Sequence, residues 1–152
     1  DKLSIAGAKL CVETLAKLEL GEIAAEKQGE SPTAYASMLK KSMGNIDWTM
    51  DADRIERLVR GLNSWPGTFT KIHGKTVKIW DCDVVCQETL TESQAAATPG
   101  TVIVSEKDQL IVKAGNGALS LRMLQPEGKK NMTVDAYLRG YPIAQGELFT
   151  QV

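Results

Sequence analysis

The chain is poor in the residues on which most catalytic and metal sites depend, since its 152 residues include one histidine and three cysteines. A structural zinc site needs four ligands, commonly in closely spaced pairs. Cys82 and Cys86 have no second pair, so we expect no zinc site. An odd number of cysteines also argues against a disulfide framework and favours a reducing compartment. We expect buried structural thiols, with Cys82 and Cys86 on one face if their strand is regular.

Long apolar segments are missing too. No run approaches the roughly 18 to 20 residues that a membrane helix needs, and no signal peptide is visible. We therefore expect a cytoplasmic protein without a membrane partner. The net charge of −1 identifies no partner by itself. With 43% apolar and 24% charged residues, the chain should form one packed domain, or a small domain plus an appendage.

The sequence does not begin with methionine and starts directly in a helical pattern, which indicates a fragment or a processed chain. Apolar and small residues at spacings of three and four predict a helix over residues 2–20, which Gly21 ends. A second apolar strip, Ile5, Ala8 and Val12, lies on the opposite side of this helix. A helix that is apolar on two sides normally packs between layers. Here we expect it to fray, fold back or pair with a second copy in a homodimer.

Two helical segments are predicted before the sheet. Residues 22–42 are mainly polar and read as a linker. The stretch YASMLKKSMG predicts a short helix that carries Lys40 and Lys41. A longer helix is predicted over residues 51–62, with Asp51 at its N-cap. Its apolar stripe is Ile55, Leu58, Val59 and Leu62, and the opposite side carries Arg57 and Arg60, with Arg54 at the edge.

A hairpin follows directly. Pro66 ends the helix, Gly67 permits a sharp change of direction, and Trp65 is expected to pack at this junction. The apolar period then changes to 2 in TFTKI and KTVKIW, which flank a His-Gly turn. Residues 91–98 are predicted to be a loop, and Thr133 to begin a last helix. Further strands are predicted at 101–105, 110–114 and 118–124, the last two joined by a Gly-Asn-Gly turn.

These elements predict the fold class of residues 43–152. Four to six short, mostly antiparallel strands lie between two helices, so the domain is mainly β with flanking helices (α+β). A small antiparallel barrel of the oligonucleotide/oligosaccharide-binding (OB) type fits this order. An open α+β sheet is the alternative.

The one histidine is not expected to be catalytic. His73 lies at the predicted hairpin turn, and no nucleophile-and-base motif surrounds it. Asp81 and Asp83 flank Cys82 in a strand and indicate a bulge or an exposed edge. The Gly-Asn-Gly sequence lacks the strand-to-helix context of a phosphate-binding loop.

The distribution of charge is more informative than its sum. Residues 54–80 contain six basic residues and one acid, and residues 109–130 contain four and one. These segments carry net charges of +5 and +3, so a nearly neutral chain can present a basic face. Phosphate backbones bind to such faces. A solvated strand face, where lysine protects an edge, is the other interpretation.

Several stretches together resemble one known family. They are RLVRGLNSWPGTFTKIHGKTVKIW, PGTV, GNGALSLRMLQPEGKKNMTVDAYLRGY and GELF, in this order. They are similar to the C-terminal domain of the methionyl-tRNA formyltransferase family. LSIAGAKLCVETLAKLELG and YASMLKKSMGNIDW resemble the segments just before that domain, so the resemblance covers nearly the whole chain.

The resemblance implies an architecture and an activity. In this family a Rossmann-like N-terminal domain transfers a formyl group from 10-formyltetrahydrofolate to the methionine of initiator methionyl-tRNA. An OB-like C-terminal domain helps to hold that tRNA. Residues 1–21 would then be the last helix of the formyl-transfer domain. The family's Asn-x-His-x-Ser signature does not occur here, so we expect no catalytic residues and no cofactor in this fragment.

The resemblance also suggests which residues face tRNA. Two lysines, at positions 40 and 41, would lie in the linker region that faces tRNA, and further basic residues would line or rim the barrel face and contact mainly phosphates. They are Lys40, Lys41, Arg60, Lys75, Lys78, Arg122, Lys129 and Lys130. The alternative function is a structural C-terminal domain of a related folate-dependent formyltransferase or hydrolase that binds no nucleic acid. A free-standing binding protein is a third interpretation, which the helical start disfavours.

Overall fold

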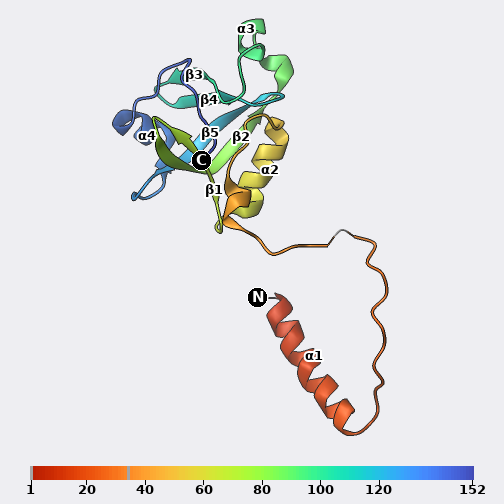
Figure 1. Cartoon of the computed structure of the whole chain (residues 1–152). Coiled ribbons are helices and arrows are strands. Elements are labelled where there is room, and N and C mark those ends of the chain that lie inside the picture. Colours follow the sequence, from red (N-terminus) through yellow and green to blue (C-terminus); the bar gives the residue numbers. More distant parts are fainter. Residues whose placement is uncertain (1, 34) are drawn as a thin grey trace. The chain divides into compact units, whose positions relative to one another are not determined.

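The computed structural model describes residues 2–33 and 35–152. The chain divides into two compact units, Asp1–Ser37 and Met38–Val152 (Figure 1).

The first unit contains one helix, α1 (Lys2–Glu19), as predicted. Gly21 has a φ of +71°, and the amides of Gly21 and Glu22 donate to the carbonyls of Leu18 and Lys17. This pair of bonds is the Schellman motif, which needs a left-handed residue and therefore favours glycine. No residue of α1 is buried within this unit. Among the described residues, no helix is long and apolar enough to cross a membrane.

The second unit contains the sheet and the remaining helices. In chain order its elements are η1 (Lys41–Gly44), α2 (Ala52–Leu62), β1 (Thr68–Ile72), β2 (Lys75–Val85), η2 (Gln87–Thr89), α3 (Glu92–Ala95), β3 (Val102–Glu106), β4 (Gln109–Lys113), β5 (Ala118–Pro126), β6 (Met132–Thr133) and α4 (Val134–Gly140).

Helix α2 has the amphipathic pattern that the sequence predicted. Ile55, Val59 and Leu62 are buried, and α2 lies along β2 (Figure 1). Asp51 occupies the N-cap position, but its side chain makes no capping hydrogen bond. The helix ends before Pro66, whose ring cannot continue it.

The predicted hairpin is present, with β1 paired to β2 in antiparallel register. The two turn residues, His73 and Gly74, have φ values of +51° and +72°. Positive φ at both positions defines a type I′ turn, whose twist matches that of the flanking strands. Two irregularities in the pairing of β2 with β5 surround Asp81, as the sequence of this strand indicated.

The sheet has six strands in the order β1-β2-β5-β4-β3, with β6 paired to the other part of β5. All strand pairs are antiparallel, so the α+β class is confirmed. The expected closed, OB-like barrel is not present. Within residues 35–152 the sheet stays open, since β1 and β3 remain edge strands. Each edge instead makes an isolated bridge to residues 146–150, hereafter the C-terminal segment: Lys71 pairs with Thr150, and Thr101 with Leu148.

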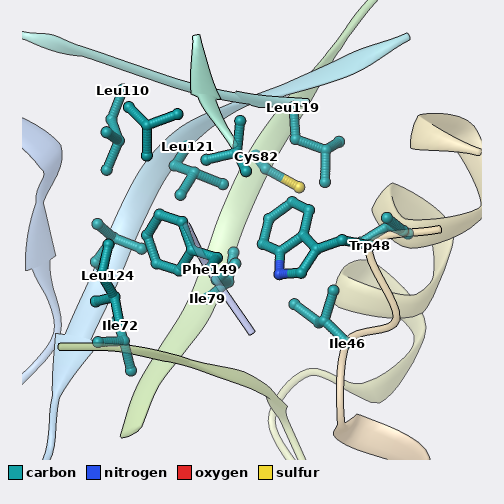
Figure 2. Close-up of a cluster of buried hydrophobic side chains, with 14 of the residues drawn as sticks. Ile46, Trp48, Ile72, Ile79, Cys82, Leu110, Leu119, Leu121, Leu124 and Phe149 are labelled. Atoms are coloured by element: carbon teal, nitrogen blue, oxygen red, sulfur yellow. The ribbon is translucent and has the colours of Figure 1, made fainter. Parts of the chain in front are cut away.

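The core is assembled around two aromatic rings. The centroids of Trp48 and Phe149 lie 5.7 Å apart, and Figure 2 shows aliphatic side chains from the strands around them. The Trp48 indole donates to Thr70 Oγ1 at 3.0 Å, and that hydroxyl donates to the Thr150 carbonyl at 2.8 Å. Among the described residues, every buried side-chain nitrogen or oxygen has a hydrogen-bond partner. The C-terminal segment is therefore part of the core.

Some local predictions were wrong. Cys82 is buried, but Cys86 is exposed because the strand ends at Val85. Cys11 on α1 is also exposed.

The predicted loop at residues 91–98 contains the short helix α3. The predicted helix around Lys40 and Lys41 is only the single 3-10 turn η1, which begins at Lys41. Trp65 does not pack at the junction, since 59% of it is exposed.

Candidate nucleic-acid interface

His73 has a structural partner rather than a catalytic one. Its Nε2 lies 2.7 Å from Oε2 of Glu147, and the same oxygen accepts from the Ala144 amide at 3.1 Å. Half of the His73 side chain is exposed. The imidazole thus links the β1–β2 turn to the C-terminal segment. The described residues also contain no group of three or more side chains suited to hold a metal ion.

One predicted contributor to the basic surface is not on the surface. Lys113 was counted in the basic segment 109–130, but only 2% of it is exposed. Its Nζ donates to the carbonyls of Ala114 at 2.5 Å and Gly117 at 3.2 Å, and burial lowers the pKa of its ammonium group. Lys113 therefore holds the Gly-Asn-Gly turn and adds nothing to the exposed positive charge.

The alternation of side chains along β1 and β2 creates an outward-facing surface with both cations and aromatic rings. Val77 and Ile79 are buried, so Lys78 between them points away from the core. Phe69 is the cross-strand partner of Lys78, and cross-strand partners share a face of the sheet. We call this surface, made of Phe69, Lys71, Thr76, Lys78 and Trp80, the outer face.

A groove begins beside Lys78. Two hollows of about 280 and 300 Å³ share Thr76, Pro126 and Glu127 in their walls. Lys78 lines one of them and Lys75 the other. Because side chains alternate along β2, Lys75 and Lys78 reach these two hollows from opposite faces of the strand.

The turn after β5 is held against the same surface. Gln125 pairs with Lys78 across the strands, and its Oε1 accepts from Trp80 Nε1 at 2.8 Å. Its Nε2 donates to the Lys129 carbonyl at 2.6 Å. This amide fixes the turn that carries Lys129 and Lys130, both exposed, beside the outer face.

The η1 turn lies against the edge of β1. The Ile46 amide donates to the Phe69 carbonyl at 2.9 Å. A Cβ on Gly44 would lie 2.0 Å from the Gly67 carbonyl oxygen and 3.2 Å from the Phe69 ring, so only glycine permits this approach. Lys41 is therefore held near the outer face, and Lys40 directly precedes it.

The two predicted arginines are less available. Arg60 donates to Glu56 one turn earlier in α2, at 2.9 and 3.3 Å. Arg122 forms an ion pair with Asp83 and lines a separate hollow, whose wall also contains Asp81. Their charges are locally compensated. Among the described residues, the lysines at positions 40, 41, 75, 78, 129 and 130 take part in none of the ion pairs.

The second unit is thus a small α+β domain whose outer face carries both lysines and aromatic side chains. The chain belongs to the family described as "Formyl transferase, C-terminal domain", whose model matches residues 38–142. This range begins at Met38, where the second compact unit also begins.

Individual relatives of known name narrow the similarity to one kind of formyltransferase. The chain is 41% identical over 150 residues to a methionyl-tRNA formyltransferase of Agathobacter rectalis, covering 99% of this chain and 46% of that protein. It is 43% identical over 148 residues to the protein of that name in Caldanaerobacter subterraneus subsp. tengcongensis, covering 97% of this chain and 46% of the relative. The resemblance stated from the sequence is thus confirmed, and the chain spans about half the length of these curated relatives.

Solved structures support the fold alone. HypX from Aquifex aeolicus matches 91% of this chain with a TM-score of 0.56 at 18% identity, and the match covers 24% of the HypX chain. A second HypX structure, in complex with tetrahydrofolic acid, has a TM-score of 0.54 at 17% identity and covers 93% of this chain and 26% of its own.

Proposed function

We propose that this chain is the tRNA-holding C-terminal part of a cytoplasmic methionyl-tRNA formyltransferase. The parent enzyme would transfer a formyl group from 10-formyltetrahydrofolate to the methionine of initiator methionyl-tRNA. The relatives named above support the enzyme class. The observation that supports the tRNA contact is a set of exposed or partly exposed lysines on and near the outer face, none of which forms an ion pair within the described residues.

We assign no step of formyl transfer to this chain. General acid–base chemistry needs a group within hydrogen-bond reach of the reacting amine, and the one histidine is paired with Glu147 at a turn. Formyl transfer and the folate co-substrate would belong to the N-terminal domain of the parent. The exposed apolar residues of α1 would pack on that domain.

The lysines would contact phosphates. Lys78 lines the groove on the outer face, Lys129 and Lys130 lie on the adjoining turn, Lys75 lies on the opposite face of β2, and Lys41 approaches from η1. Ammonium groups on such a surface position an RNA backbone without reading its sequence. Arg60 and Arg122 would contribute less, because an acidic neighbour already compensates each charge.

Titration of the 152-residue chain with initiator tRNA at several salt concentrations tests the proposal. With about three to five phosphate contacts, the logarithm of affinity should fall by about 0.7 to 0.9 per contact for each tenfold rise in salt. Lys78→Glu should weaken binding of every tRNA to a similar degree and reduce the salt slope.

Lys107→Glu is the matched control, because Lys107 is exposed at the turn between β3 and β4, away from the groove-lining residues. It should change binding much less than Lys78→Glu. Equal effects of the two variants, or no binding of the unmodified chain at low salt, would reject the basic surface. The structural-domain function would then replace it.

A further inference from the structure

We propose that Trp65 stacks on an unpaired base of the bound tRNA. This inference rests on the proposed function and adds to it a contact that is not electrostatic. It assigns a role to the one exposed tryptophan of the second unit.

The three tryptophans have different environments. Trp48 is 3% exposed and its indole is bonded to Thr70, while Trp80 is partly buried and bonded to Gln125. Trp65 is 59% exposed, and within the described residues its indole has no hydrogen-bond partner. This large aromatic ring and its free N–H are therefore available for contact with another molecule.

The backbone around Trp65 is held on several sides. Pro66, the next residue, is buried. The Gly67 amide donates to the Leu62 carbonyl at 2.9 Å, and Asn63 Nδ2 donates to the Trp80 carbonyl at 3.3 Å. The indole is thus presented from an anchored junction, which lowers the entropy lost when a partner binds.

The surroundings of Trp65 favour an anionic partner with aromatic rings. Gly67, two residues later, is in close approach to Gly44 of the turn that begins at Lys41. Phe69 and Lys78 follow on the outer face. Surfaces that combine cations with aromatic side chains bind unpaired nucleotides, whose phosphates meet the charges and whose bases stack. Transfer RNA offers such bases in its loops.

The exposed apolar side chains of Leu39 and Met43 near η1 would also suit a protein partner. A protein surface would gain from the apolar area but would not need the lysines of η1 and of the outer face. The lysines therefore favour RNA, and the experiment separates the two.

The test measures dissociation constants of the unmodified chain, Trp65→Ala and Trp65→Phe for initiator tRNA at three salt concentrations. Loss of one stacked base is worth ~1–3 kcal/mol, so Trp65→Ala should bind about five- to a hundredfold more weakly. Its salt slope should stay unchanged, because no phosphate contact is lost. Trp65→Phe should retain most of the affinity, since a phenyl ring can still stack.

Two controls distinguish base stacking from a general effect of losing an exposed apolar side chain. Leu148→Ala truncates another exposed apolar residue, 47% exposed, on the C-terminal segment and should leave binding unchanged. A fully paired RNA duplex offers no accessible base, so Trp65→Ala should bind it as well as the unmodified chain does. Thermal unfolding of Trp65→Ala should match that of the unmodified chain, because the side chain is mostly exposed.

The outcomes are distinguishable. If the unmodified chain binds tRNA with a steep salt slope but Trp65→Ala binds equally well, stacking is rejected and the proposed function stands; a protein contact would then explain the exposed indole. An equal loss of affinity for tRNA and duplex would also reject stacking. If the unmodified chain does not bind tRNA, both proposals fail.

Discussion

Replacing Lys113 with methionine tests whether a buried ammonium group holds the turn between β4 and β5. The variant removes the charge and keeps a side chain of similar length. The Ala114 carbonyl, 2.5 Å from Nζ, loses the donor that the structure gives it. A buried carbonyl left without a donor costs about 1–3 kcal/mol.

Lys113 Nζ also donates, over longer distances, to the carbonyls of Gly117 at 3.2 Å and Gly115 at 3.4 Å and to Gln87 Oε1 at 3.4 Å. The Gly117 carbonyl also accepts from the Ala114 amide at 3.1 Å, and Gln87 Oε1 accepts from the Gly117 amide at 2.7 Å. Removing the charge also removes its desolvation penalty, which offsets part of the loss. We therefore expect a destabilisation of about 1–3 kcal/mol, a large fraction of the stability of an ordinary domain.

Urea unfolding, followed by tryptophan fluorescence, measures this change. With a slope of ~1–3 kcal/mol per molar urea, the midpoint should fall by about 1 M. Lys107→Met, at an exposed turn, should stay within ~0.5 kcal/mol of the unmodified chain. A Lys113→Met variant as stable as Lys107→Met would refute the reasoning.

The stability of Lys113→Met should also depend on pH differently from that of the unmodified chain at alkaline pH. Because burial lowers the pKa of Lys113, the unfolded chain binds a proton that the native chain lacks between the native pKa and 10.5. Stability from this group therefore rises with pH in that window. Lys113→Met lacks the effect, so its deficit should grow between pH 7 and pH 10, while contributions common to both proteins cancel. A deficit that shrinks would contradict the assignment.

Two further predictions concern other residues. Burial raises the pKa of Cys82 from 9.0 to about 12. As pH rises above 9, the thiol therefore loses its proton only in the unfolded chain. The free energy of unfolding should fall by up to ~1.4 kcal/mol per pH unit in this range. Urea unfolding from pH 8.5 to 10.5 should show a shallower decline in Cys82→Ala than in Cys86→Ala, whose thiol is exposed; equal declines would exclude Cys82. In hydrogen exchange of a dilute monomer, the amides of α1 should be weakly protected because none of its residues is buried. Strong protection without a partner chain would show instead that α1 packs on another part of this chain.

Local chemistry made much of the second unit predictable. A two-residue His-Gly turn between alternating strands predicts the β1–β2 hairpin, and the spacing of Ile55, Val59 and Leu62 predicts the buried side of α2. Helix α3 was missed although its signal was present. Thr91 and Gln94 form a capping box, in which the Gln94 amide donates to Thr91 Oγ1 and the Thr91 amide to Gln94 Oε1.

Features that depend on distant contacts were not predictable. Lys113 is a charged residue at the end of a strand, and nothing local shows that the carbonyls of the next turn will surround it. Barrel closure depends on whether β1 and β3 meet, and the pattern of each strand is compatible with either outcome. For Trp65, the Pro-Gly step fixes the change of direction but not whether the indole turns inward.

Among the candidate interface residues, periodicity could place Lys78 on an outward face. The ion pairs that compensate Arg60 and Arg122 depend on rotamers and, for Arg122, on the register between β2 and β5. Counting charges along the chain therefore overstated the positive surface.

The C-terminal segment also determines when the fold can be completed. Thr70 and Thr150 are 80 residues apart in the chain, and Asn45 and Val152, joined by two hydrogen bonds, are 107 apart. Contacts at such separations form late, because a long loop must close before they contribute. During synthesis on the ribosome, β1 and β3 would keep unpaired edges until residues 146–150 emerged. Exposed edges can pair with other chains, so the nascent domain would be open to such pairing until this segment had emerged and docked.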